Sequence, residues 1–600
     1  MLELKEISLL TGKGDEEQTL LHEIAARFPQ AHFGAILGPS GCGKSTLLKV
    51  IAGIREPTLG SVHWQGRNLA EEEDLAPDQI GYVPQFGIAF DFLTVWESVE
   101  TALRLRVGGL SAQYRRERVE EILGNVGLAE IGDRQVRVLS GGQKRRLALA
   151  LEMISSPALL LSDEVTSGLD PKAEDEIVKL MKQLSREENR IVLTVTHSLR
   201  HIDLYDSVLV LFQGHLAYHG PSEFLYHYFN VENPEDLFPR LAQRKANDWH
   251  RSWVKHRAAY YAAQTDGYQA VLRSEDEPPE LPALETSKKS STKLFEEIEE
   301  DIEGIEVEAE EDTGKVTPSA FWQFAILLAR RWKIFLRDRS QMLLHLALIV
   351  GFPCLVVIFA WGGLPQIHNL RLEPQSNVIQ QLKENVDFVK RASRDGSLVS
   401  GLIMFQVILL TLMGSNNSAR EIASERQIFE KEKFAGVRIS SYVASKACFL
   451  ATLVAVQSLW MGVFVNMICH FPGDLMSQVA VLFLVNGAMT SICLGISSLM
   501  KTPEQASLVS IYLVGFQLPL SGAILALPAL IGRITRPFIA AYWGWSGFWQ
   551  TMRDSRFYDV IQSITQTHLS ASALCIWVLC SHILLGLVLA HTGCKNSRWE

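Results

Sequence analysis

No domain of this 600-residue chain has the overall basic excess that nucleic-acid binding requires. The formal net charge is −10, and residues 296–312 alone contain eleven acidic residues and no basic one. The remainder of the chain is therefore close to neutral. Composition indicates that nucleic acid is not a partner.

Cysteine is also scarce, and the spacing of the cysteines argues against both a zinc-binding protein and a secreted disulfide-rich protein. Of eight cysteines, Cys42 lies in the N-terminal half, seven lie beyond residue 350, and none belongs to a Cys-x-x-Cys pair. Neither a zinc site nor a secreted disulfide framework is expected. Met1–Leu10 lacks the positively charged start and apolar core of a signal peptide, so we expect the N-terminal half to stay in the compartment where it is made.

The N-terminal region, residues 1–245, alternates short aliphatic runs with amphipathic helical stretches. This pattern is typical of an α/β sheet domain. The expected strands include Gly34–Leu37, Leu159–Leu161, Ile191–Thr196 and Ser207–Phe212.

Residues 246–316 break this pattern. Trp249–Tyr261 has the composition of a short aromatic helix, whereas residues 275–312 are rich in proline, serine and acid, which predicts a charged linker. A solvated tether is the simpler interpretation, and an acidic docking surface is the alternative.

The remainder of the chain is dominated by long apolar runs. They cover about residues 342–364, 398–415, 443–469, 477–500, 506–527 and 570–591. Each is near the ~20 residues that a helix needs to cross a bilayer, which predicts an all-α membrane domain of six transmembrane helices in residues 342–600. We expect Asn416 and Asn417 to end the second run early, and Lys446 to reach the headgroups from the third.

A phosphate-binding loop follows the first of the four strands given above. Its residues are Gly38, Pro39, Ser40, Gly41, Cys42, Gly43, Lys44, Ser45 and Thr46. The glycines let backbone N–H groups turn toward phosphates, Lys44 adds a positive charge, and Ser45 offers a hydroxyl to Mg²⁺. The strand–loop–helix context predicts a P-loop NTPase.

Two carboxylates follow a second strand. Asp163 can hold Mg²⁺ through water, and Glu164 is placed to polarise the attacking water as a general base. An Asp-Glu pair alone would mean little, but with the phosphate loop it predicts a site of NTP hydrolysis.

A second glycine-rich helix start, another anion site, lies in the same domain. It consists of Ser140, Gly141, Gly142 and Gln143. One nucleotide does not need two such sites. At this point the sequence resembles the ATP-binding cassette ATPases, in which the signature of one subunit closes over the γ-phosphate held by the phosphate loop of the other.

The resemblance extends to three single residues and implies their roles. By family role, Gln85 senses Mg²⁺ and the membrane domain, Asp170 lines the dimer seam, and His197 contacts the γ-phosphate. The resemblance thus implies ATP and Mg²⁺ as cofactors. It implies Glu164, His197 and Gln85 as catalytic residues, and Ser45, Gln85 and Asp163 as metal contacts.

The domain order resembles that of the G-type (white-like) half-transporters, which have an ABC-2 type membrane domain. Residues 214–221 resemble the end of their nucleotide domain. The stretch Trp322–Arg339, within residues 317–341, resembles their connecting helix at the membrane surface. Its basic residues suit anionic headgroups: Arg330, Arg331, Lys333, Arg337 and Arg339. Glu425–Glu432 resembles the cytoplasmic loop that couples the two domains.

This resemblance implies an ATP-driven exporter in the lipid bilayer, a homodimer or a dimer with a related half-transporter. Its location would be the plasma (inner) membrane, with the ATPase domain cytoplasmic. By resemblance, Met413, Asn416, Phe516 and Gln517 would line a cavity for a small hydrophobic, lipid-like or drug-like substrate. Ordinary helix packing is the alternative for these four residues. The alternative function is a membrane-anchored ATPase that gates or signals by ATP-driven shape change without transport.

Overall fold

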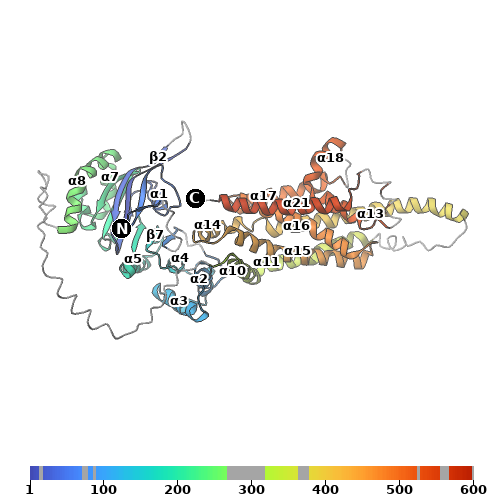
Figure 1. Ribbon diagram of the computed structural model, residues 1–600, viewed down its shortest axis with the longest axis horizontal. Helices are drawn as coiled ribbons and strands as arrows, with labels where there is room; N and C mark the ends of the chain where they lie inside the picture. Colours follow the sequence, from blue (N-terminus) through green and yellow to red (C-terminus); the bar gives the residue numbers. More distant parts are fainter. Residues whose placement is uncertain are drawn as a thin grey trace. The chain divides into compact units, whose positions relative to one another are not determined.

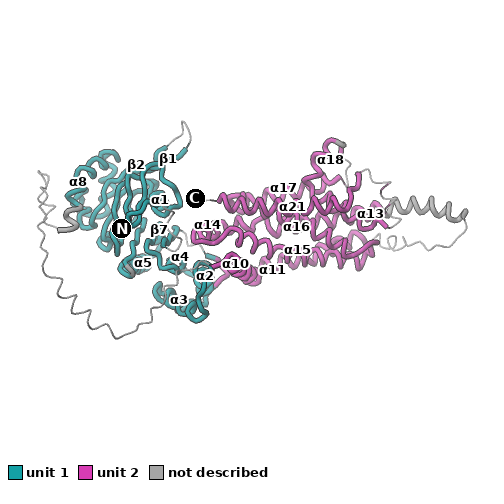
Figure 2. The backbone as a smooth tube through the Cα atoms, viewed as in Figure 1, with its two compact units in different colours: residues 1–89, 94–317 teal, residues 90–93, 318–600 magenta. Residues whose placement is uncertain are grey.

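The computed structural model describes most of the chain. The described residues are 1–12, 18–69, 79–85, 89–266, 318–361, 378–522, 527–554, 558, 562 and 567–597. The acidic linker predicted at 275–312 lies outside them. The chain forms two compact units, coloured separately in Figure 2: residues 1–89 with 94–317, and residues 90–93 with 318–600.

The first unit is built on one ten-stranded sheet with the order β5-β4-β1-β2-β10-β9-β3-β8-β7-β6. The strands are β1 (Leu2–Thr11), β2 (Gln18–Phe28), β3 (His32–Leu37), β4 (Leu59–Trp64), β5 (Arg67–Asn68), β6 (Ile80–Val83), β7 (Leu159–Asp163), β8 (Ile191–Val195), β9 (Ser207–Phe212) and β10 (His215–Gly220). Strands β6, β7, β8, β3 and β9 are parallel.

The parallel strands form the centre of this unit. Every residue of β3, β7 and β8 is buried. Strands covered on both faces are expected to be mostly apolar without strict alternation, which agrees with the sequences of these three strands. The predicted α/β domain and its four expected strands are confirmed.

The helices of the first unit have clear sequence signals at their starts. They are α1 (Lys44–Ile51), α2 (Val95–Arg106), α3 (Ala112–Asn125), α4 (Gly141–Met153), α5 (Pro171–Arg186), α6 (Leu225–Phe229), α7 (Leu237–Ala242) and α8 (Ala246–Asp266). Thr94 and Glu97 form a capping box at α2, which satisfies backbone N–H groups that the helix leaves free. Helix α8 contains the predicted aromatic stretch and buries Trp249 and Trp253.

The second unit is helical. Its helices are α10 (Ala320–Arg337), α11 (Arg339–Ala360), α13 (Val378–Ser418), α14 (Arg426–Phe434), α15 (Ile439–Cys469), α16 (Leu475–Leu499), α17 (Pro503–Leu520), α18 (Ala529–Thr535), α19 (Ala540–Gln550) and α21 (Ser572–Asn596). Helix α16 packs against α13, α15 and α21, and Figure 1 shows these helices side by side.

Five helical stretches among the described residues are long and apolar enough to cross a membrane. They are α11, Gly396–Phe434, α15, α16 and α21. The predicted run 506–527 corresponds to α17, which has 18 residues and begins with Pro503, Glu504 and Gln505. This polar first turn explains why α17 is not among the five.

Helix α13 ends at Ser418, one residue after Asn417, which agrees with the expectation that Asn416 and Asn417 end the second apolar run. Asn417 itself is buried inside the unit. The Asn417 amide donates to Gln457 Oε1 of α15 at 2.8 Å and accepts from Gln457 Nε2 at 3.0 Å. Because the side-chain amides of Asn417 and Gln457 satisfy each other, these two polar residues are tolerated inside the helical unit.

Helix α19 was not predicted, because residues 528–569 have no apolar run long enough to span a bilayer. Its 11 residues would extend only ~16 Å as a helix. Trp545 and Trp549 are nonetheless fully buried in the core of this unit. Short aromatic segments of this kind contribute to the core without being transmembrane candidates.

Candidate functional site

The phosphate loop joins β3 to α1 with the backbone that its glycines allow. Gly38 has φ +152°, and a Cβ placed there would lie 2.2 Å from the carbonyl oxygen of Leu211. Gly43 precedes α1 with φ +103°. A side chain is therefore excluded at Gly38 by sterics and disfavoured at Gly43 by conformation.

Lys44 is buried at the start of α1. Its Nζ donates to the carbonyl oxygens of Gly38 at 3.0 Å and Pro39 at 2.9 Å. Burial lowers the pKa of Lys44, and burial raises the pKa of the neighbouring Cys42 thiol. Cys42 is thus a packing residue of the loop, and Lys44 supplies its positive charge.

The hydroxyl of Ser45 meets the carboxylate of Asp163 at the end of β7. Ser45 Oγ donates to Asp163 Oδ1 at 2.8 Å, and Tyr82 Oη donates to Asp163 Oδ2 at 3.4 Å. Burial raises the pKa of Asp163, against the opposing effect of these hydrogen bonds. Tyr82 was missed from the sequence; its position on β6, the neighbour of β7, is the signal that would have indicated it.

Glu164 lies between Gln85 and His197. Gln85 Nε2 donates to Glu164 Oε2 at 2.8 Å, and His197 Nε2 is 2.5 Å from Glu164 Oε1. The backbone of Glu164 is left-handed, with φ +49°, and its N–H donates to the carbonyl oxygen of Val195 at 3.0 Å. This conformation is costly for a non-glycine residue, so surrounding contacts must hold it.

The sheet topology explains why these residues meet. Asp163 is the last residue of β7, Gln85 and His197 follow β6 and β8, and the phosphate loop follows β3. These four strands are parallel neighbours, so their carboxyl ends lie along one edge. Of the three predicted metal contacts, Ser45 and Asp163 bond to each other, whereas Gln85 bonds to Glu164.

The signature residues lie at a different position, at the start of α4. Ser140 and Gln143 form a capping box, in which each side chain bonds the backbone N–H of the other residue. Asp170 caps α5 by accepting from the N–H groups of Lys172 and Ala173. Gly142 faces the side chain of Ala173, so the two helix starts are neighbours.

The four substrate-cavity candidates separate into two pairs. Met413 and Gln517 are buried in the second unit, and Gln517 Oε1 accepts from the backbone N–H of Ala541 at 3.0 Å. Asn416 and Phe516 are exposed. Packing within the chain explains the first pair, so only the second remains available to a substrate or partner.

Three basic residues expected at the membrane surface are buried instead. Arg330 pairs with Glu432, and Arg331 pairs with Glu421. Lys446 pairs with Glu421 at 3.0 Å and Glu425 at 2.5 Å. Exposed fractions of the three basic side chains are only 4–7%. The expectations that Lys446 reaches the headgroups and that both arginines contact them are wrong, because acidic partners neutralise all three inside the unit.

Two family models match this chain. Residues 21–167 match the model described as ABC transporter, and residues 322–552 match the model described as ABC-2 type transporter.

Three relatives show how far the similarity extends. The ABC transporter ATP-binding/permease protein Rv1747 of Mycobacterium tuberculosis is 27% identical over 98% of this chain and 61% of its own length. The sulfate/thiosulfate import ATP-binding protein CysA of Pectobacterium atrosepticum is 32% identical over 49% of this chain and 87% of its own length. The ABC transporter G family member STR2 of Medicago truncatula is 34% identical over 36% of this chain and 30% of its own length. The chain thus spans 61% of the mycobacterial relative's length.

Proposed function

Because the chain belongs to the ABC transporters, with the domain order of a G-type half-transporter, we propose that it is a dimeric ATP-driven exporter. The membrane-length helices and the ABC-2 match make it a multi-pass integral membrane protein. Its ABC ATPase domain binds ATP, and we assign that ATP to the phosphate loop. The proposal adds that the domain hydrolyses ATP, that hydrolysis is coupled to movement of the membrane helices, and that a substrate is exported.

The observation that carries the proposal is the position of Glu164, beside Asp163 and between Gln85 and His197. A carboxylate held by two neighbours at the end of a strand can orient water and accept its proton as the γ-phosphate is attacked. His197 would contact that phosphate, and Gln85 would adjust Glu164 when the membrane half moves. These roles give each residue of the cluster a use in ATP hydrolysis.

The residues present also fit Mg²⁺. The Ser45 hydroxyl and the Asp163 carboxylate, 2.8 Å apart, are the hard oxygen donors that this ion prefers. When bound, Mg²⁺ would neutralise charge on the phosphate oxygens. Lys44 would bind the β/γ-phosphates, and the N–H groups of the loop would orient them.

We assign the second anion site, at Ser140–Gln143, to a second copy of this chain. Ser140 and Gly141 are exposed at the start of α4, while the phosphate loop lies at the end of β3. Both halves of a composite site are present in one sequence, so a homodimer would have two complete sites. A related half-transporter is the alternative partner.

The exposed Asn416 and Phe516 support a small substrate that is hydrophobic or amphipathic, such as a lipid or drug. Because ATP is cytoplasmic, we place the ATPase domain in the cytoplasm and the helices in the plasma (inner) membrane.

A screen for substrate-stimulated ATP hydrolysis tests the proposal. The purified chain would be reconstituted in lipid vesicles and assayed with lipids, drugs and glycolipids, with the Glu164→Gln variant as control. We expect at least one compound to raise hydrolysis by the unmodified protein only. Hydrolysis that no compound affects would favour an ATPase that gates or signals without transport.

A further inference from the structure

Arg330 of α10 is clamped between a carboxylate and a phenyl ring. Its guanidinium donates two hydrogen bonds to Glu432 of α14. Its Cζ lies 4.4 Å from the centre of the Phe90 ring, within the range of a cation–π contact. The Arg330 side chain is only 7% exposed, so water does not screen either contact effectively.

The next residue, Arg331, has an equivalent clamp. It donates two hydrogen bonds to Glu421, and its Cζ lies 4.4 Å from the centre of the Phe449 ring. The two clamps have the same chemistry on adjacent residues. They differ in the origin of the ring, which makes the second clamp an internal control for the first.

Phe449 belongs to α15, but Phe90 comes from the N-terminal sequence, five residues after Gln85. Residues 90–93 nevertheless form part of the second unit. Arg337 at the end of α10 also holds this segment, since its Nη1 donates to the carbonyl oxygen of Phe92 at 3.1 Å. Five residues of chain span at most ~18 Å, so a movement of Gln85 has a short covalent route to Phe90.

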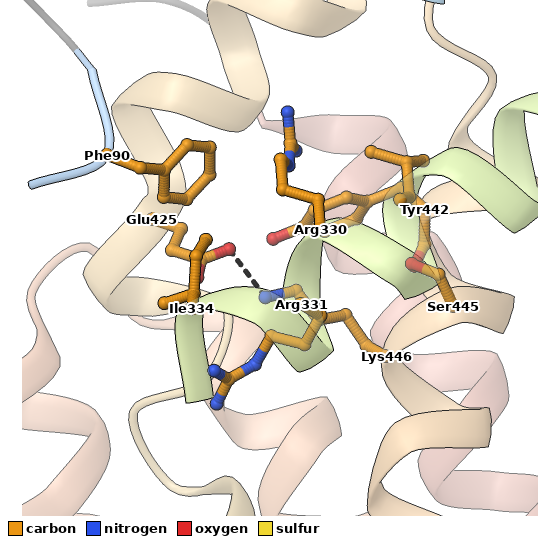
Figure 3. A pocket seen from close by; sticks show the side chains of 9 residues that line it. Phe90, Arg330, Arg331, Ile334, Glu425, Tyr442, Ser445 and Lys446 are labelled. Atoms are coloured by element: carbon orange, nitrogen blue, oxygen red, sulfur yellow. Dashed lines mark hydrogen bonds and ion pairs between the residues drawn. The ribbon is translucent and has the colours of Figure 1, made fainter. Parts of the chain in front are cut away.

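The cluster around Phe90 is too tightly packed to be a ligand site. The residues lining it, labelled in Figure 3 except Leu327, enclose about 10 Å³, which is space for roughly one water. In Figure 3 the Phe90 ring enters from the blue segment at the left and faces the group of Arg330, Arg331 and Lys446. Phe90 therefore packs against the other side chains of the cluster rather than lining a ligand site.

We propose that Phe90 is a positioning residue for coupling: by stacking on Arg330 it fastens residues 90–93 to α10 and, through Glu432, to α14. The inference rests on the proposed function. If Phe90 withdrew, a buried guanidinium would lose its ring contact, so Phe90, Arg330 and Glu432 should move together. A displacement that begins at Gln85 would then reach α14 without any change in nucleotide contacts.

The test compares Phe90→Ala with Phe449→Ala in the full-length protein in lipid nanodiscs. A spin label at Met467→Cys, a position 70% exposed near the end of α15, reports the distance between two copies of the chain. The exposed Cys448 and Cys580 are first changed to serine. The readouts are ATP affinity, unfolding temperature, and the distance change caused by ATP with vanadate.

We expect Phe90→Ala to leave ATP affinity unchanged and to reduce the population that changes distance by about fivefold or more. Phe90→Tyr should restore the change, whereas Phe90→Leu, which retains apolar bulk without a ring, should not. Phe449→Ala should lower the unfolding temperature but keep the distance change.

A full distance change in Phe90→Ala, or equal losses in Phe90→Ala and Phe449→Ala, would overturn the inference. Restoration by Phe90→Leu would overturn it as well, because bulk alone would then suffice. If the unmodified protein neither hydrolyses ATP nor changes distance, the proposed function fails and the inference falls with it.

Discussion

Removing the charge of Glu421 should destabilise the protein far more than removing the charge of a surface glutamate. Glu421 accepts hydrogen bonds from Arg331 and Lys446, and all three side chains are at most 6% exposed. With Arg330, Glu425 and Glu432 the cluster contains three positive and three negative groups. The variant Glu421→Gln would leave one buried positive charge without compensation.

The expected cost follows from this burial. Breaking a buried ion pair by removing one partner costs about 3–5 kcal/mol, because the remaining charge stays out of water. The matched control is Glu120→Gln, whose partner Arg116 is one helical turn away and whose pair is 76% and 59% exposed. Such an exposed pair contributes about 0.3–0.5 kcal/mol.

The assay is equilibrium unfolding of the purified protein in mixed micelles, followed by tryptophan fluorescence. We expect Glu421→Gln to lower the free energy of unfolding by roughly ten times the effect of Glu120→Gln. Combining Glu421→Gln with Lys446→Met restores neutrality and should recover part of the loss. Equal effects of the two single variants would refute the argument, because the charges of the cluster would then be solvated.

Three further predictions concern the nucleotide site. Glu164→Gln should retain ATP binding while turnover falls by ~10²-fold or more, as measured by phosphate release; near-normal turnover would remove Glu164 as the general base. Burial raises the pKa of Asp163. Ionisation of this carboxyl group therefore destabilises the nucleotide-free folded protein as pH rises through the raised pKa. Asp163→Asn should therefore raise the unfolding temperature at neutral pH and abolish hydrolysis. The gain in unfolding temperature should vanish well below about pH 4, where the aspartic acid is as neutral as the asparagine, and a gain independent of pH would contradict the argument. In a mixed dimer, Ser140→Arg in one subunit should impair the site whose Lys44 belongs to the other, and a monomer that hydrolyses at the dimer's rate would disprove the composite site.

The sequence could predict which residues lie together at the candidate nucleotide site, because the determinants of that cluster are local. The phosphate loop requires glycines at fixed spacing, Asp163 is the last residue of a buried strand, and Glu164 directly follows it. Parallel strands then bring their carboxyl ends together without further information. Tyr82 was missed, because its side chain reaches Asp163 from the neighbouring strand.

The inward orientation of the charges in the second unit was not predictable in the same way. Arg331 and Glu421 are 90 positions apart, and Arg330 and Glu432 are 102 apart. A basic amphipathic stretch considered alone gives no information on partners so distant in sequence. Such a stretch therefore predicts contact with headgroups, whereas the structure buries Arg330 and Arg331 against carboxylates.

The measurement that tests the central claim most directly is the number of molecules transported per ATP hydrolysed. Vesicles containing the purified protein, with its ATPase domain outside, would receive Mg²⁺, ATP and the compound that stimulates hydrolysis most. The account predicts that this compound accumulates in the vesicles against its gradient in a fixed ratio to phosphate release, and that Glu164→Gln abolishes both. Sustained hydrolysis that depends on Glu164 but moves no compound would contradict it.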